Sequence, residues 1–206
     1  MPVRMVTIVF TIFSLFFRGP YLVGVPVMCN TRFEEGALAF GMIGSAFGVG
    51  SLIGLVAAGS LPRPPERYYG VLTLVDVATI GVSLLVYAVA PTVDWALAAS
   101  ALCGITDGYL MIILVSWLQS RVPTKLLGRV MGMIMFFNQG VSPISAAIAG
   151  ALIEVSLEGM FLGAGAILMA FAVVGAFVPV VRHMGLTGGT AMATSPDNKE
   201  RAPSPP

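Results

Sequence analysis

Residues 118–132, LQSRVPTKLLGRVMG, form a short polar stretch between two strongly apolar segments. The stretch holds three cations, Arg121, Lys125 and Arg129, within nine consecutive residues. Loops rich in Lys and Arg between apolar segments stay on the cytoplasmic side of a membrane. The stretch therefore predicts a membrane protein in which this loop faces the cytoplasm.

The composition of the whole chain agrees with a membrane location. Hydrophobic residues make up 57% of the 206 residues and charged residues only 10%, whereas a soluble domain carries about 25% charged residues. The net charge of +1 argues against a nucleic-acid partner. The two cysteines, Cys29 and Cys103, are too far apart to form a metal or redox motif, and we interpret them as free thiols.

Apolar runs of roughly 20 residues, each long enough to cross a bilayer as a helix, recur along the chain. The first is too long, and too soon followed by another, to be a cleaved signal peptide. The Gly19-Pro20 pair should kink it. We predict an all-α membrane protein whose bundle covers residues 1–183 and is followed by a disordered cytoplasmic tail over 184–206. The predicted spans are about 5–28, 36–60, 68–90, 95–118, 129–153 and 159–181.

The distribution of cations predicts how the six spans are oriented. Only Arg32, beside Glu34 and Glu35, falls in a loop on the side opposite to the polar stretch. Cations mark the cytoplasmic side, so both termini should be cytoplasmic in a multi-pass protein of the cell (inner or plasma) membrane. The cations on the predicted cytoplasmic side are Arg4, Arg63, Arg67, Arg121, Lys125, Arg129 and Arg182.

Arg18 lies inside the first predicted span, where a charge costs roughly 2.5–3.5 kcal/mol or more. Polar residues recur every three or four positions around it, which places them on one helical face. We interpret this face as the lining of a water-filled cavity; the alternative is a helix-packing stripe. The residues of the face are Thr7, Thr11, Ser14, Arg18 and Tyr21.

Two carboxylates lie inside later spans. Asp107, near the middle of the fourth span, could pair with Arg18, carry a coupling proton or contact a cationic substrate; a purely structural pair with Arg18 is the alternative. Asp76 lies nearer the cytoplasmic end of the third span, where a structural role toward Arg67 or the cationic loop is favoured. In the fifth span, polar amides and hydroxyls need partners across helices or in a cavity. The predicted substrate or ion pathway comprises Arg18, Tyr21, Ser14, Asp107, Asn138, Gln139 and Ser142.

Glycines in the second span predict close helix packing, because Gly-x-x-x-Gly spacing lets two backbones approach each other. The glycines concerned are Gly44, Gly48, Gly50 and Gly54. The second span, with GVGSLIGLVAAGSL (48–61), also resembles the fifth, with GVSPISAAIAGAL (140–152). Equivalent helices in two triplets would be expected of a three-plus-three inverted repeat.

The chain shows no pattern typical of an enzyme. The single histidine, His183, lies just past the last span, and there is no phosphate-binding Gly-x-x-x-x-Gly-Lys-Ser/Thr loop. We therefore expect neither an enzyme nor a bound metal or cofactor.

Residues 118–133 and 138–153 together resemble the major facilitator superfamily, in the loop between spans ten and eleven and the helix that follows. The family pattern is matched by Gln119, Val122, Pro123, Gly128, Arg129, Gly140, Pro143 and Gly150. GPYLVGVPV (19–27) and the glycine-rich second span are similar to spans seven and eight of that family. The resemblance covers residues 5–181. Within the family, the chain most resembles the drug-exporter branch that includes macrolide and enterobactin exporters.

The resemblance implies half of the major facilitator fold, the C-terminal six helices. It also implies that the loop with Arg121, Gly128 and Arg129 acts as a cytoplasmic gate, with Asp76 as a candidate partner. Gly140, Pro143 and Gly150 are implied to serve helix packing. One departure puts gating by the loop after the second span in doubt, because Gly59 to Arg63 lack the family's acidic residue.

These observations predict a secondary active transporter that exports a small amphipathic solute coupled to an ion gradient. As one half of a two-bundle carrier, the chain would need a second six-helix half, either a separate chain or a second copy. Its other partners would be the lipid bilayer and the solute. The alternative function is a truncated, transport-inactive remnant or an interaction subunit of a transporter.

Overall fold

The computed structural model describes residues 16–62, 64–65, 68–121, 128, 132, 135–136, 140 and 142–177; for Leu118 and Arg121 it describes the backbone alone. Within these residues all regular structure is helical. The elements are η1 (Pro20–Gly24), α2 (Val25–Arg32), α3 (Ala37–Ser60), α4 (Tyr69–Val89), α5 (Val93–Arg121), α7 (Ser142–Val155) and α8 (Leu157–Phe177).

Four of these helices are long and apolar enough to span a membrane, which confirms the all-helical membrane class. They are α3, α4, α5 as far as Trp117, and α8. The predicted first and fifth spans extend into residues outside the described part, and α7 covers only the second half of the fifth. The count of six spans and the inverted repeat therefore stay predictions, and the predicted tail over 184–206 lies outside the described residues.

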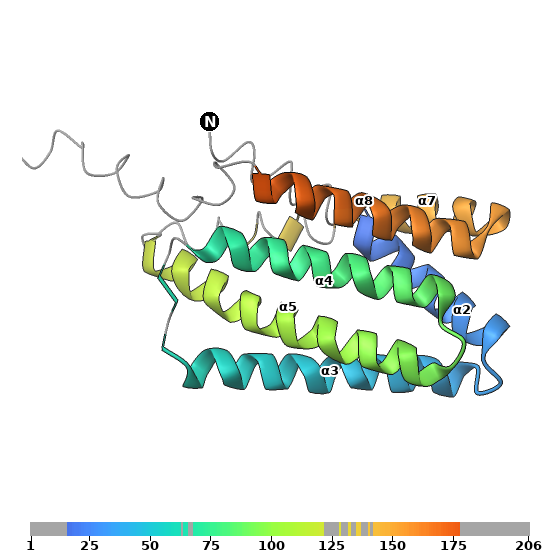
Figure 1. Ribbon diagram of the computed structural model, residues 1–206, viewed down its shortest axis with the longest axis horizontal. Coiled ribbons are helices and arrows are strands. Elements are labelled where there is room, and N and C mark those ends of the chain that lie inside the picture. Colours follow the sequence, from blue (N-terminus) through green and yellow to red (C-terminus); the bar gives the residue numbers. More distant parts are fainter. Residues whose placement is uncertain are drawn as a thin grey trace, which may run out of the picture.

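The long helices lie side by side with their axes nearly aligned (Figure 1). Helix α5 packs against α3 on one side and α4 on the other, and α4 in turn packs against α8. Helices α3 and α5 run in the same direction, and α4 runs opposite to both (Figure 1). Because α4 and α5 are antiparallel, a short loop connects the end of α4 with the start of α5. The core lies between these helices, and many apolar side chains on their outer faces are exposed, as suits a bundle surrounded by lipid.

Glycines make the contact between α3 and α5 very close. A Cβ atom added at Gly50 or Gly54 would collide with the α5 backbone at Ala101 or Ile105. On the facing helix, Gly104 and Gly108 meet the α3 backbone at Phe47 and Ser51 in the same way. Since no side chain separates the two helices here, they approach closely along about two turns.

At Gly19-Pro20, where the sequence predicts a kink, the chain forms a π-helix. Proline cannot donate the usual backbone hydrogen bond, and at Pro20 the chain widens into η1 before returning to α-helical geometry at Val25. The Gly19 backbone N–H donates to Ser145 Oγ on α7, at 2.7 Å. This bond ties the first helical segment to α7.

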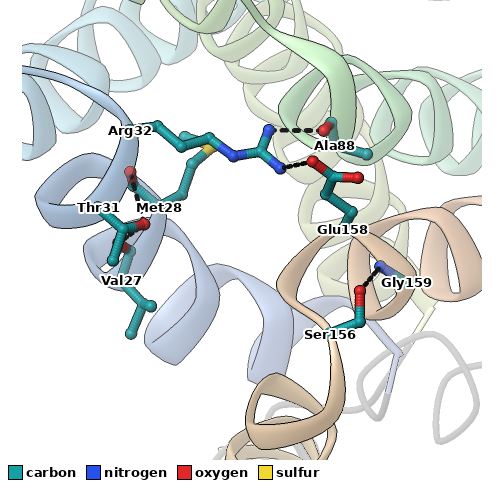
Figure 2. A network of polar contacts seen from close by, with 8 residues as sticks. All are labelled: Val27, Met28, Thr31, Arg32, Ala88, Ser156, Glu158 and Gly159. Atoms are coloured by element: carbon teal, nitrogen blue, oxygen red, sulfur yellow. Dashed lines mark hydrogen bonds and ion pairs between the residues drawn. The ribbon is translucent and has the colours of Figure 1, made fainter.

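Arg32, the last residue of α2, joins α2 to α4 and α8 (Figure 2). Its guanidinium donates to the Ala88 carbonyl at the end of α4 and pairs with the Glu158 carboxylate in the first turn of α8, both at 2.6 Å. The Ser156 hydroxyl accepts the Gly159 N–H and caps the start of α8. Arg32 thus satisfies a carbonyl that the last turn of α4 leaves unpaired.

Candidate functional site

The candidate site lies between α4 and α5, where polar side chains are enclosed by apolar helices. The Ser83 hydroxyl lies 2.9 Å from the Thr79 carbonyl and 3.0 Å from the Ala99 carbonyl, so it fixes how the antiparallel pair is aligned. Two helical turns further on, this alignment brings Asp76 to the level of Thr106 on α5, close enough for the two side chains to interact. The Asp76 side chain thus faces the interior of the bundle.

Asp76 is almost completely enclosed. Its relative exposure is 4%, and its Oδ1 atom has no hydrogen-bond partner among the described residues. An enclosed carboxylate without a full set of partners is costly, so such residues are usually functional. The sequence favoured a structural role for Asp76 near the cationic loop. The structure places it inside the bundle, and its expected partner Arg129 lies outside the described residues.

Asp107 connects Asp76 with Arg18. It lies on α5 directly after Thr106, and its charge interacts with those of both Asp76 and Arg18. Asp107 and Arg18 are both half-buried. The structure therefore brings together one cation and two carboxylates from three segments, which the sequence placed at compatible depths but could not orient.

Aromatic and hydroxyl groups surround this charged cluster. The Tyr21 ring packs between Phe17 and Phe47, with centroid distances of 5.6 and 6.1 Å. Cys103 is buried near Tyr21 and both carboxylates. The Ser100 hydroxyl donates to the Ile43 carbonyl on α3 at 2.9 Å. The arrangement offers charge, aromatic surface and polar atoms together, and no metal-binding group of side chains occurs within the described residues.

The remaining predicted pathway and gate residues are placed only in part. Ser142 begins α7, one turn before Ser145, and is half-buried. Gly128 is exposed. Ser14, Asn138, Gln139 and Arg129 lie outside the described residues, as does the side chain of Arg121.

The glycines expected to serve packing fall into two groups. Gly50 and Gly54 face α5, as described above. The others have no described atom within 4 Å of an added Cβ, so they face open surface in the described bundle: Gly44, Gly48, Gly140 and Gly150. Pro143 is also exposed.

A separate cavity of about 300 Å³ lies between η1, α7 and α8. Its lining is almost wholly apolar and includes Phe16, Pro20, Ile148 and Met160. Among the described residues its wall holds no charged side chain, so these residues offer no chemistry comparable to that of the cluster around Asp76.

Comparison with known proteins identifies the family. The model of the Major Facilitator Superfamily matches residues 1–146. The chain belongs to the Major Facilitator Superfamily. The proteins of this family are transporters, which agrees with the expectation that the chain is not an enzyme and with its membrane-spanning helices.

Two relatives within the Major Facilitator Superfamily give a closer comparison. The multidrug efflux pump Tap of Mycolicibacterium fortuitum is 28% identical over 147 residues, and the uncharacterised MFS-type transporter y4rN of Sinorhizobium fredii is 26% identical over 159 residues. Each match covers 71% of this chain and 36% of the relative. The chain thus matches little more than a third of each relative's length. No solved structure matches the chain significantly.

Proposed function

We propose that the chain forms one bundle of a secondary active transporter that exports a small amphipathic solute in exchange for an ion. Three facts support this proposal: membership of a transporter family, similarity to a multidrug efflux pump, and a charged cluster inside the membrane-spanning helices. The observation that carries it is an enclosed carboxylate inside the bundle, Asp76 at 4% exposure, near Asp107, whose charge interacts with that of Arg18. Charges at this depth mark solute and ion pathways more often than packing sites.

The cluster suits an amphipathic solute because it combines polar and apolar contacts. Tyr21, Phe17 and Phe47 offer aromatic surface, and Asp107 offers a negative charge to a cationic group. A pathway closed on all sides needs a second bundle, supplied in our proposal by another chain or a second copy. In that arrangement the six helices form a three-plus-three inverted repeat, and rocking of the two bundles exposes the site to each side in turn.

We further propose that both termini face the cytoplasm, where the loop with Arg121, Gly128 and Arg129 contributes to a gate. The excess of cations on that side supports the orientation. Arg32 and Glu158 then lie on the opposite side, where they join α2, α4 and α8.

Efflux of a fluorescent amphipathic dye tests the proposal. Cells that express the chain should lose the dye faster than control cells, and dissipating the proton gradient should abolish the difference. Asp107→Asn should remove efflux while leaving the amount of protein in the membrane unchanged. Asp94→Asn, which alters an exposed carboxylate at the start of the same helix, is the matched control and should retain efflux.

Two results would count against the proposal. Efflux that persists in Asp107→Asn would remove this residue from the mechanism. No efflux from well-inserted wild-type protein, alone or with a second six-helix half, would favour the transport-inactive alternative.

A further inference from the structure

The apolar cavity between η1, α7 and α8 has no part in the proposed export function. Its volume is about 300 Å³, which on the order of ten water molecules would fill. Each ordered water needs roughly 2–4 polar partners. The described lining residues supply only two hydroxyl groups, those of Ser145 and Ser156, and Ser145 Oγ already accepts the Gly19 N–H. The cavity therefore suits an apolar occupant better than water.

The cavity opens at the surface of the described bundle. Helices α7 and α8 lie at one edge of the bundle (Figure 1). Three aliphatic residues of the cavity wall are between 42% and 48% exposed: Ile148, Leu152 and Ile167. Between them, a Cβ atom added at Gly163 would meet no described atom within 4 Å. A lipid chain can thus enter the cavity from the bilayer without passing through the bundle.

The polar groups near the cavity gather at one of its ends. Helix α7 lines the cavity from Ser145 to Val155, a length of about 15 Å along the helix axis. Directly after Val155 comes Ser156, also in the wall. Two residues further, Glu158 pairs with Arg32 (Figure 2). An apolar channel that ends beside charged groups has the same order as a phospholipid, whose acyl chain leads to a charged head.

Arg32 is the group at this end that suits a phosphate. Its bonds to the Ala88 carbonyl and the Glu158 carboxylate occupy only some of its N–H donors. The Arg32 side chain is 22% exposed, so the other donors can be reached from outside. A guanidinium binds phosphate oxygens through several N–H groups at once. Arg32 thus offers a headgroup contact beside the mouth of an apolar cavity.

We propose that this cavity binds one acyl chain of a membrane phospholipid whose phosphate lies at Arg32. In the proposed orientation of the chain, the lipid belongs to the outer leaflet. It would contact the first helical segment, α7 and α8 together, and so fill a gap that their side chains leave open. The site is separate from the charged cluster between α4 and α5, and it does not depend on the export function.

Photo-crosslinking tests the site on the full-length chain. The probe is phosphatidylglycerol with a photoreactive diazirine in its acyl chain, in phosphatidylcholine vesicles that contain the purified protein. Mass spectrometry of the peptides should locate the cross-links mainly on the cavity residues of α7 and α8. Excess unlabelled phosphatidylglycerol should remove these cross-links, because a single site saturates. Diacylglycerol, which lacks the phosphate, should compete much less.

Two matched variants separate this site from general contact with lipid. Gly163→Leu should fill the cavity and lose the cross-links, and the open space at Gly163 lets the variant fold. Gly48→Leu adds the same side chain at an open position on α3 and should retain them. Arg32→Gln should remove the advantage of phosphatidylglycerol over diacylglycerol as a competitor.

Four outcomes would overturn the proposal. They are cross-links spread evenly over all exposed helices, cross-links that excess phosphatidylglycerol does not reduce, full labelling of Gly163→Leu, and equal competition by diacylglycerol. Competition in the wild type decides the matter if circular dichroism shows that a variant is unfolded. Displacement of the probe by the amphipathic dye, but not by phosphatidylglycerol, would assign the cavity to the transported solute instead.

Discussion

At the scale of single residues, Arg32 shows how contacts distant in sequence fix the end of the bundle. It joins Ala88 and Glu158, 56 and 126 residues away along the chain. The sequence marked Arg32 only as an isolated cation on the predicted outer side. Nothing in its local pattern identifies the two partners, because both depend on how α4 and α8 end.

Replacing Arg32 by Gln should lower stability modestly. Glu158 is 67% exposed, so water screens the ion pair and its loss costs about 0–1 kcal/mol. The unpaired Ala88 carbonyl adds roughly 1 kcal/mol. Thermal unfolding in detergent should show a larger loss for Arg32→Gln than for Glu158→Gln, which retains the Ala88 bond. Equal losses would mean that the Ala88 bond contributes nothing.

Ser145 provides a second residue-scale test. Ser145→Ala would leave the buried Gly19 N–H without its acceptor, which costs about 1–3 kcal/mol. The melting temperature should fall measurably, whereas Ser142→Ala, one turn earlier and half-buried, should change it little. A Ser145→Ala protein as stable as the wild type would show that the π-helix does not depend on this bond.

At the scale of elements, the glycines of α3 separate into two faces that the sequence alone could not distinguish. Gly44, Gly48, Gly50 and Gly54 all fit small-residue spacing, and which of them meets α5 depends on the rotation of the helix. Four apolar helices could be predicted because length and hydropathy decide them locally. The sequence predicted a kink at Gly19-Pro20 but not the π-helix, because the contact of Gly19 with Ser145 on α7 leaves no local signal.

Alanine substitutions should reveal the two faces of α3. Gly54→Ala places a methyl group against the α5 backbone and should destabilise the protein by about 1–3 kcal/mol. Gly48→Ala meets no described atom within 4 Å and should be neutral or stabilise by up to roughly 1 kcal/mol through helix propensity. Thermal unfolding of the two variants decides the point. Similar effects of both would contradict the close α3–α5 contact.

At the scale of the whole molecule, orientation is a prediction that labelling can check. Both native cysteines are buried, so the wild type provides a low background. Glu35→Cys, beside Arg32, should react with a membrane-impermeant maleimide in intact cells. Ser60→Cys, at the opposite end of α3, should react only after permeabilisation. The reverse pattern would place both termini outside.

The charged cluster combines what the sequence can and cannot predict. Arg18 and Asp107 stand out because charges are rare in apolar spans, and their depths agree. That Asp107 also adjoins Asp76 follows from the alignment of α4 and α5, which Ser83 fixes through Ala99. Such an alignment leaves no local signal, so Asp76 could be interpreted only through the nearest cationic loop.

The interaction between Arg18 and Asp107 is the central claim, and a double-mutant cycle tests it most directly. The measurement is the thermal stability of wild type, Arg18→Gln, Asp107→Asn and the double variant, all in the same lipid. If the two side chains interact inside the bundle, the effects should be non-additive by about 0.5–3 kcal/mol, with the double variant less destabilised than the sum of the single ones. Additive effects would contradict the claim and leave the candidate site without its counter-ion.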